Sequence, residues 1–551
     1  MTRVAGEPGP EGEPAVGGGS PADRHISRRG FLAAAAGLVV AACSPAVPSD
    51  LPRFSASAST GPLESGPATS GPASTGSPSP GVPGPVPSRG PSAVAVENLQ
   101  PGDRGWQAGF SGVPAVLGYL DRTSVAPGDS IGLRVRGNGP FDARWYRVGW
   151  YRGAGGRLMR VDRRLSAKPT PGMVVDASSG LAEEPWPEAL RIEVPPDWTS
   201  GVYVVVLEPT AGTAGVAVFV VRPGSVAPAS VLYVNAAATW QAYNHHGPSL
   251  YGTLPAGPYG GASWERAHEI SFDRPYSEAG GAGYLPRWEA AFIRWQERNG
   301  HDVAYCADLD LEMHPEVVGG HRLLVLPGHH EYWTTPMRDT LEATLATGVS
   351  AAFLSANTIY WQVRLEASPL GPGRRIVCYK SQTADPITPT HPELTTCQWR
   401  LPPVNRPEAL VIGQMYGHVV LTPADWVVVN SGHWLYAGTG VHDGDRFVSL
   451  VGQEYDTFYP TVSPPGTELW AQSPTVTAAG QADPTGHPTM HTATVHATPA
   501  GGTVVAAGTY QWSWALDSFG QHYYQGRFTP TDARVARVTT NIYRRLGDGT
   551  G

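Results

Sequence analysis

The sequence predicts a multidomain protein in which a small β-sandwich, residues 108–225, precedes a larger α/β domain, residues 228–547. Two observations support this division. The first range alternates apolar and polar residues between Pro and Gly turns, which is typical of a sandwich. In the second range, short apolar runs alternate with amphipathic stretches, which indicates βαβ units and a parallel sheet. The two ranges hold about 450 residues, too many for one hydrophobic core.

The sandwich strands follow from their residue patterns. Residues 130–135 (SIGLRV) and 189–194 (ALRIEV) alternate apolar and polar side chains, and residues 202–207 supply another strand. The run 216–221 (VAVFVV) is apolar throughout, as a strand covered on both faces would be. These strands resemble an immunoglobulin-like sandwich. Because the range holds no chemical motif, we expect it to pack against the second domain or to shape its cleft.

The α/β domain is predicted from strands and helices that follow each other in turn. We expect helices at 285–299, 336–346 and 532–546 and strands at 302–307, 322–326 and 350–354. This layout resembles the glutamine-amidotransferase type of flavodoxin-like fold, although the G-x-C-x-G nucleophile turn of that group is absent. Residues 366–450 are irregular and rich in Pro, and no elements are assigned to them.

The amino terminus predicts where the protein works. The segment SRRGFL at 27–32 resembles a twin-arginine export signal, and the apolar run 31–42 is shorter than the roughly 20 residues of a membrane span. The run ends in VAAC, which resembles a bacterial lipobox, so residues 1–43 are the signal and Cys43 is the lipidated residue. A plain secretory signal with a coincidental Cys is the alternative. Residues 44–107, rich in Ser, Pro and Gly, are predicted to be a disordered tether. We therefore expect an extracytoplasmic protein anchored to the cell membrane.

One segment concentrates chemical groups. The apolar run 323–327 leads into Gly328–Trp333, which reads GHHEYW and places two imidazoles and a carboxylate after a buried strand. Open α/β sheets bind ligands at the carboxyl ends of their strands. A zinc protease needs H-E-x-x-H, and the second His is missing here. The plain alternative is a helix N-terminus with polar loop histidines.

Five further segments accompany this motif: TWQAYN at 239–244, SFDRPY at 271–276, SAN at 355–357, VGQEYD at 451–456 and GTYQWSWALD at 508–517. Together with GHHEYW they make residues from about 228 to 545 resemble the catalytic domain of the large (beta) subunit of N,N-dimethylformamidase, an iron-dependent amide hydrolase. No single segment is specific, but the combination is.

The resemblance implies a mononuclear ferric centre held by two tyrosines and a glutamate. We assign these ligands to Tyr243, Tyr276 and Glu331, with Tyr251 as the reserve for either tyrosine. A phenol with a pKa near 10 binds a metal at neutral pH only when a strong Lewis acid displaces its proton, which favours Fe(III) over zinc. Such an ion would polarise a small amide substrate and acidify a bound water.

The resemblance also suggests four catalytic residues: His329, Asn357, Lys380 and Glu454. His329 or Glu454 could carry a proton from water to the leaving amine, and Asn357 could donate to the oxyanion. Alternatively, Lys380 pairs with a surface carboxylate, and Glu454 is the structural partner of an arginine.

Other function classes remain open. A non-catalytic surface lipoprotein that keeps the fold as a binding module is the main alternative, and a serine hydrolase using Ser355 is weaker because the flanking glycines of G-x-S-x-G are absent. The adjacent His245 and His246 are expected to make loop hydrogen bonds rather than bind one ion.

Composition and cysteines bound the partners. A net charge of -8 without a long Lys or Arg run argues against nucleic acid. Because the family enzyme works with a small subunit absent from this chain, we expect either a separate small partner or a homo-oligomer. Cys378 and Cys397 could form a disulfide outside the cytoplasm, and Cys306 is expected to be buried and reduced.

Overall fold

The computed structural model describes residues 91–224, 229–252, 266–277, 281–420, 422–475, 489–520 and 529–549. The export signal, Cys43 and residues 44–90 of the tether lie outside this part of the chain. The remainder of the predicted tether is ordered, so that prediction reaches too far. Residues Ala93–Glu97 form helix α2, capped by the Ser92 side chain, and Arg104–Gln107 form η1. Trp106 is fully buried in η1, and it is the large apolar side chain that a disordered segment would lack.

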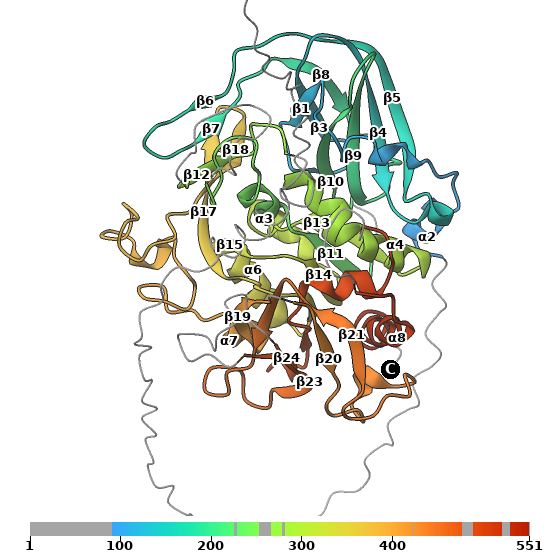
Figure 1. Ribbon diagram of the computed structural model, residues 1–551, viewed down its shortest axis with the longest axis vertical. Coiled ribbons are helices and arrows are strands. Elements are labelled where there is room, and N and C mark those ends of the chain that lie inside the picture. The colour runs from blue at the N-terminus through green and yellow to red at the C-terminus, as the bar shows by residue number, and fades with distance from the viewer. Residues whose placement is uncertain are drawn as a thin grey trace, which may run out of the picture.

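The first folded unit contains two sheets of mostly antiparallel strands, and it lies at one end of the molecule (Figure 1). One sheet has the order β1 (Leu117–Leu120), β3 (Ser130–Arg136) and β8 (Glu188–Glu193). The other has the order β2 (Ser124–Val125), β10 (Gly215–Val221), β9 (Gly201–Pro209), β4 (Gly139–Val148) and β5 (Gly156–Ala167). A small hairpin, β6 (Val174–Val175) and β7 (Ala182–Glu183), extends from this unit. The four strands expected from the sequence are all present, while the immunoglobulin-like class stays a prediction.

Strand β10 has two different buried faces. Ala217, Phe219 and Val221 belong to the core between the two sheets, whereas Val218 and Val220 belong to a larger core shared with the rest of the protein. The prediction of a strand covered on both faces is therefore confirmed. The five-stranded sheet is the layer through which the sandwich is joined to the second unit.

A seven-stranded sheet forms the centre of the second unit. Its spatial order is β13 (Val303–Ala307), β11 (Val231–Asn235), β14 (Leu323–Gly328), β16 (Ser350–Ser355), β25 (Thr503–Ala506), β24 (Met490–Ala497) and β23 (Glu468–Pro474). The strands from β13 to β25 are parallel, and the last two are antiparallel. Counted along the chain, the parallel strands have the order 2-1-3-4-5 that flavodoxin-like sheets have. On this order we propose that class for the second unit.

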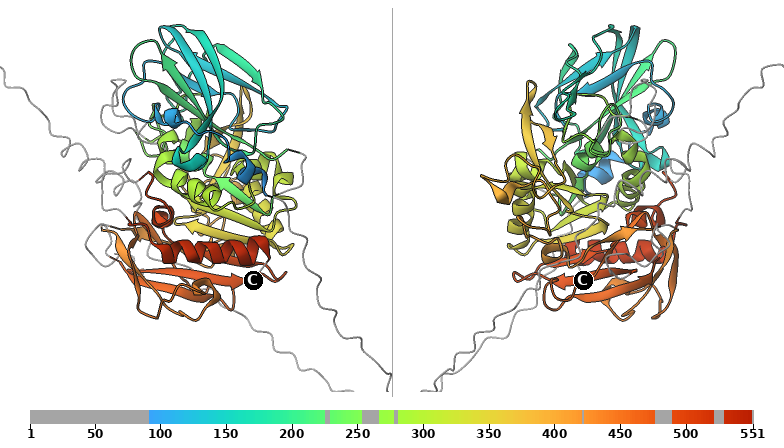
Figure 2. Two further views of the ribbon diagram at one scale, coloured as in Figure 1. Left: turned by 90° about the vertical axis from the view of Figure 1, so that its right-hand side faces the viewer. Right: turned by 60° about the vertical axis from the view of Figure 1, so that its left-hand side comes forward.

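The helices expected from the sequence are confirmed. The first runs through η4 (Leu285–Glu289), a wider π-helical turn, and α4 (Ala290–Arg298), and the second is α6 (Thr335–Leu345). The last consists of α8 (Ala533–Ile542) and η10 (Tyr543–Asp548), and α8 runs alongside the central sheet (Figure 2). Shorter helices are α3 (Ala237–Ala242), η3 (Gly281–Gly283), α5 (Asp310–Met313), η5 (Pro315–Val318), η6 (Pro392–Leu394), α7 (Ala409–Ile412), η7 (Trp434–Tyr436) and η8 (Tyr510–Ala515). Among the described residues, no helix combines the length and apolar character needed to cross a membrane.

Residues 366–450, which the sequence left unassigned, contribute to small accessory sheets. One has the order β12 (Glu269–Ser271), β18 (Gly371–Val377), β17 (Trp361–Ser368) and β15 (Tyr332–Thr334). Two ladders pair β19 (Met415–Val419) with β22 (Glu454–Thr457), and β20 (Ala424–Val427) with β21 (Arg446–Val451). Because β15 and β22 carry or adjoin motif residues, these sheets hold several site segments in place.

Buried polar contacts join the two units. Arg147 of β4 and Glu297 of α4 are both fully buried and form an ion pair with a nitrogen–oxygen distance of 2.7 Å. The Ser200 hydroxyl accepts a hydrogen bond from the backbone N–H of Tyr305 at 2.9 Å. Breaking the first pair would leave an uncompensated buried charge, which costs about 3–5 kcal/mol. These contacts hold the sandwich in place against the second unit.

The described cysteines are all buried free thiols. Cys306 agrees with its prediction. Cys378 and Cys397 are not joined, so the suggested disulfide is not part of this structure. Burial raises the pKa of the Cys378 thiol to about 11 and that of Cys397 to about 12, which keeps both protonated and unreactive at neutral pH.

Candidate active site

Two tyrosines and a glutamate meet at the carboxyl edge of the central sheet. Tyr243 caps the end of α3, Tyr251 lies eight residues further on, and Glu331 follows β14. The Tyr243 hydroxyl lies 2.8 Å from the Tyr251 hydroxyl and 2.8 Å from Glu331 Oε2. The Tyr251 hydroxyl donates to Glu331 Oε1 at 2.7 Å. The two rings are stacked with centroids 4.3 Å apart, so their oxygens point to the same place.

Local backbone contacts explain why Glu331 points into this cluster. Its N–H donates to the Thr239 hydroxyl of α3 at 2.9 Å, and its carbonyl accepts from the N–H groups of Tyr360 and Trp361 at 2.9 and 3.0 Å. The preceding Gly328 has a φ of +81°, where a β-carbon would also lie 3.2 Å from the buried Glu289 side chain. The hydrogen bonds of the Glu331 backbone and the conformation of Gly328 therefore hold the turn after β14 in place.

The segment after Tyr243 is held by a buried arginine. One nitrogen of Arg274 donates to the carbonyls of His246 and Pro248 at 2.8 and 2.7 Å. Arg274 is 1% exposed, and burial lowers the pKa of its guanidinium to about 10. The arginine of the SFDRPY segment thus stabilises the turn that connects Tyr243 with Tyr251.

His329, Tyr510 and Glu454 form a second group beside the first. His329 Nε2 lies 3.2 Å from Glu331 Oε2 and 3.8 Å from Glu454 Oε2. The Tyr510 hydroxyl contacts His329 Nε2 and donates to Glu454 Oε2 at 2.5 Å. Burial lowers the pKa of His329 well below its ordinary value, as does the neighbouring His330, so the imidazole is neutral at pH 7.

Lys380 lies on the opposite side of the tyrosines. Its Nζ is 3.5 Å from the centroid of the Tyr251 ring and 5.0 Å from that of Trp361. Burial raises the pKa of Glu331, while the charge of Lys380 and hydrogen bonds from Tyr251, Tyr243 and Trp361 oppose the rise. Lys380 thus contacts aromatic ring faces, which differs from the alternative that it pairs with a surface carboxylate.

Asn357 occupies the turn after β16 in a left-handed conformation with a φ of +51°. Its backbone N–H donates to Asp456 Oδ1 at 2.8 Å, and burial raises the pKa of Asp456 to about 7. The side-chain Oδ1 of Asn357 is buried without a hydrogen-bond partner among the described residues. An unpaired buried acceptor costs about 1–3 kcal/mol, and such a group suits a site that receives a ligand.

Tyr276 does not join the cluster. Its hydroxyl makes no hydrogen bond to Tyr243, Tyr251 or Glu331 within the described structure, and its ring instead lines a cavity against the sandwich. Burial raises the pKa of Tyr276, partly offset by Arg374. The proposed assignment of Tyr276 as a ligand therefore does not fit this geometry, because the residue lines the cavity against the sandwich and makes none of the hydrogen bonds of the cluster. The reserve residue Tyr251 takes its place.

Ser355 lacks the partners of a catalytic serine. Its hydroxyl lies 2.8 Å from the Thr358 hydroxyl and contacts no histidine within the described structure. His246 Nε2 lies 3.1 Å from Glu184 Oε2, and the His245 ring lies 3.5 Å from the Ser249 hydroxyl. The geometry therefore favours loop roles for both histidines.

Two tyrosines of the site were not singled out from the sequence. The Tyr332 hydroxyl lies 2.5 Å from that of Tyr251, and Tyr510 links His329 with Glu454. Tyr332 belongs to the GHHEYW motif and Tyr510 to the GTYQWSWALD motif. The sequence therefore indicated both segments, but it gave neither tyrosine a role. Among the described residues, no group of three His, Cys, Asp or Glu side chains is placed to hold a metal ion. Of these four residue types, the cluster of Tyr243, Tyr251 and Glu331 contains Glu331 alone.

The fold and the site define a class of protein with a parallel-stranded sheet whose carboxyl edge holds a buried carboxylate among tyrosine hydroxyls. The family model "N,N-dimethylformamidase beta subunit-like, C-terminal" matches residues 142–525, and the chain belongs to that family. The matched range also covers most of the sandwich, which the sequence resemblance had left out.

Other comparisons add little. No curated protein sequence is similar enough to this chain to match it. A solved structure of a cycloisomaltooligosaccharide glucanotransferase from Paenibacillus sp., complexed with cycloisomaltoheptaose, aligns with 35% of this chain at 14% identity and a TM-score of 0.13. The chain spans 27% of that protein's length, and so low a TM-score carries no argument.

Proposed function

We propose that this chain hydrolyses the amide C–N bond of a small formamide-like substrate, with Tyr243, Tyr251 and Glu331 holding a mononuclear ferric ion. The observation that supports this most is the convergence of two phenol oxygens on one buried carboxylate at 2.7–2.8 Å. Family membership supports a dimethylformamidase-like hydrolase, and the metal and the substrate are part of the proposal.

The three side chains suit a ferric ion by chemistry and by spacing. Phenol and carboxylate oxygens are hard donors, and phenols ionise at neutral pH when a strong Lewis acid replaces their protons. Neighbouring oxygens around an octahedral cation at about 2.0–2.1 Å lie roughly 2.9 Å apart. The Tyr243 and Tyr251 hydroxyls, 2.8 Å apart, match that spacing.

When bound, the ion would polarise the amide carbonyl and acidify a water molecule. The protein's own residues supply the proton handling. The neutral imidazole of His329 would accept a proton from the attacking water and return it to the leaving amine. Tyr510 holds the His329 ring through Nε2 and links it to Glu454.

Asn357 and Lys380 would act on the substrate and on Glu331. The unpaired Oδ1 of Asn357 would accept a hydrogen bond from an N–H of the leaving amine. The side-chain NH₂ of Asn357 would donate a hydrogen bond to the oxyanion, as expected from the sequence. Lys380 opposes the rise in the pKa of Glu331 and so favours the carboxylate form that a cation needs.

The location and partners belong to the same proposal. The SRRGFL and VAAC segments support twin-arginine export and a lipid anchor at Cys43, which suits an enzyme that folds around its metal before export. A small separate subunit or a second copy of the chain would complete the assembly as in the family enzyme.

Metal content and amine release test the proposal together. We expect about one iron per chain, a visible phenolate-to-metal band, and release of amine from a formamide panel. Glu331→Ala should remove the iron. Iron without hydrolysis would favour the binding-module alternative, and loss of hydrolysis in Ser355→Ala would favour the serine hydrolase.

A further inference from the structure

A hairpin of the sandwich packs against segments that lead to the candidate ligands. Figure 1 shows this hairpin, β6 and β7, beside β12 and β18 of the second unit. The Ser179 carbonyl between the two strands accepts the backbone N–H of His268 at 2.7 Å. Glu183 of β7 forms an ion pair with Arg375 of β18 at 2.8 Å. The hairpin is therefore a further contact between the two units.

Glu184 follows β7 and contacts residues 244–250, which connect the two candidate ligand tyrosines and are called the ligand turn. Glu184 is 1% exposed, its N–H donates to the Asp273 carbonyl at 2.9 Å, and its carbonyl accepts the Tyr119 hydroxyl at 2.6 Å. Its side-chain Oε2 lies 3.1 Å from His246 Nε2. Because an ionised carboxyl only accepts hydrogen bonds, the imidazole Nε2–H is the donor. The backbone bonds of Glu184 thus aim its side chain at the ligand turn.

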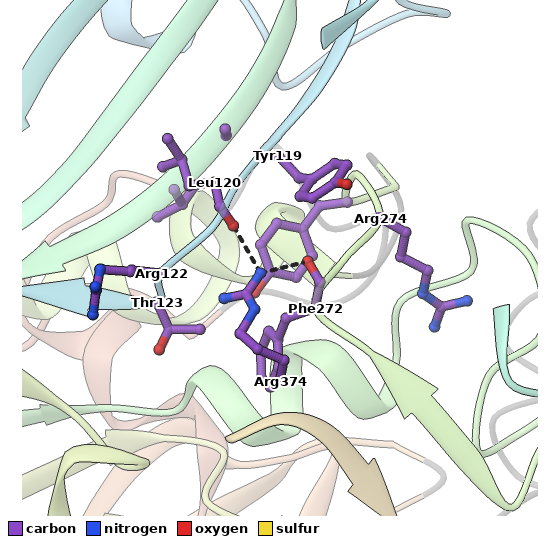
Figure 3. A pocket seen from close by; sticks show the side chains of 10 residues that line it. Tyr119, Leu120, Arg122, Thr123, Phe272, Arg274 and Arg374 are labelled. Atoms are coloured by element: carbon purple, nitrogen blue, oxygen red, sulfur yellow. Dashed lines mark hydrogen bonds between the residues drawn. The ribbon is translucent and has the colours of Figure 1, made fainter. Parts of the chain in front are cut away.

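The charge of Glu184 also acts on Arg274, which holds the same turn. Arg274 donates to the carbonyls of His246, Pro248 and Asn244 at 2.8, 2.7 and 3.4 Å, and these neutral oxygens do not balance its positive charge. Figure 3 shows its side chain extending away from the cavity at the sandwich. Burial lowers the pKa of the Arg274 guanidinium, and the negative charge of Glu184 opposes this most. Since an uncompensated buried charge is costly, Glu184 stabilises Arg274 in place.

The ligand turn also fits closely between its neighbours. Gly247 has a φ of +84°, and a side chain there would collide with the sulfur of Met173, just before β6. On the other side, the Asn244 side-chain oxygen accepts the N–H groups of His246 and Ser277 at 3.2 and 2.9 Å. The turn is therefore held between the sandwich hairpin and the segment that follows Arg274.

We propose that Glu184 is a positioning residue for Tyr251, which it acts on through His246 and Arg274, so that the sandwich is part of the active centre. Pro248, whose carbonyl Arg274 binds, lies three residues before Tyr251. A displaced turn would therefore move the Tyr251 hydroxyl away from Glu331. The effect on iron rests on the function proposed above, whereas the effect on the ligand turn depends on contacts within the chain alone.

Amide hydrogen exchange of the iron-free, full-length protein tests the position of the turn. Glu184→Ala should speed exchange in peptides that cover residues 244–252 and leave peptides of β14 and β16 unchanged. Glu183→Ala is the matched control, because it removes the neighbouring carboxylate and its ion pair with Arg375. This control should leave exchange in residues 244–252 unchanged. Unchanged exchange in Glu184→Ala, or equal changes in both variants, would overturn the proposal.

Iron binding tests the consequence at the site. In Glu184→Ala the apparent dissociation constant for iron should rise about tenfold or more, as expected for the loss of one hydrogen bond to a charged group. The visible phenolate-to-metal band should shift, because Tyr251 meets the ion in a different geometry, and Glu183→Ala should keep both properties. An altered exchange rate with unaltered iron affinity and band would show a structural role only and overturn the proposal.

A second variant covers the case in which Glu184→Ala does not fold. Glu184→Gln keeps an acceptor for His246 and removes only the charge, so it should remain folded and show the same changes at smaller size. A Glu184→Gln protein that matches the unmodified one in exchange and in iron affinity would refute the role of the charge on Arg274. Absence of iron from the unmodified protein would instead refute the proposed function, and hydrogen exchange would then decide whether Glu184 fixes the turn.

Discussion

Replacing each of the two candidate ligand tyrosines by phenylalanine separates their roles. Tyr251→Phe removes a hydroxyl that lies 2.7 Å from Glu331 Oε1, 2.8 Å from the Tyr243 hydroxyl and 2.5 Å from the Tyr332 hydroxyl. Tyr276→Phe removes a hydroxyl with none of these contacts. The phenylalanine ring keeps the stacking on Tyr243, so the change is confined to one oxygen.

The expected magnitude follows from the lost contact. A hydrogen bond to a charged group contributes about 1.5–3 kcal/mol, which would correspond to a change of roughly 10- to 150-fold in the affinity for iron. If Tyr251 also ligates the ion, the loss of iron affinity should exceed this range. Tyr276→Phe should keep its iron, its visible band and its rate of amine release.

Elemental analysis, visible absorption and amine release are measured on both variants prepared in parallel. Thermal unfolding of the iron-free proteins shows whether each variant is folded. If Tyr276→Phe loses iron while Tyr251→Phe retains it, the structural choice of Tyr251 is wrong and the assignment made from the SFDRPY segment is right.

Three further predictions address pH, mechanism and location. Burial raises the pKa of Asp456 to about 7, so the folded state binds a proton more tightly than the unfolded chain, and stability should fall as pH rises from about 4 to 7 and level off above 7. The whole loss is on the order of 4 kcal/mol, of which about 2–3 kcal/mol falls between pH 5 and 7; melting temperatures between pH 5 and 7 should depend less on pH in Asp456→Asn, and equal slopes would contradict the assignment. Ser355→Ala should retain most amine release whereas His329→Ala should lose most of it at comparable iron content, and the reverse order would exclude water as the nucleophile. Cys43→Ala should move the protein from the membrane to the soluble fraction, an expectation that fails if the unmodified protein is already soluble.

Much of the fold could be predicted because its signals are local. Strands such as 216–221 carry period-two or fully apolar patterns, and helices such as 285–299 carry a period of 3.6. Strands β19 and β20 were missed because they are only five and four residues long and pair with strands about twenty or more residues further on. Strands β17 and β18 form a local hairpin of eight and seven residues, which the sequence analysis left within its unassigned Pro-rich range. Residues 93–107 were assigned to the tether because their few apolar side chains, Val94 and Trp106, become buried only through contacts with distant segments.

The site shows the same division between local and distant information. Glu331 was found because a buried strand and a glycine turn precede it, and these features are local. The choice between Tyr251 and Tyr276 depends on how the chain returns to the sheet edge after α3. That path is set by Arg274, whose donors bind carbonyls of His246 and Pro248 and hold the turn between Tyr243 and Tyr251. Arg274, two residues before Tyr276, thus positions the proposed ligand Tyr251, and under this proposal the SFDRPY segment contributes to the site through Arg274 rather than through its tyrosine.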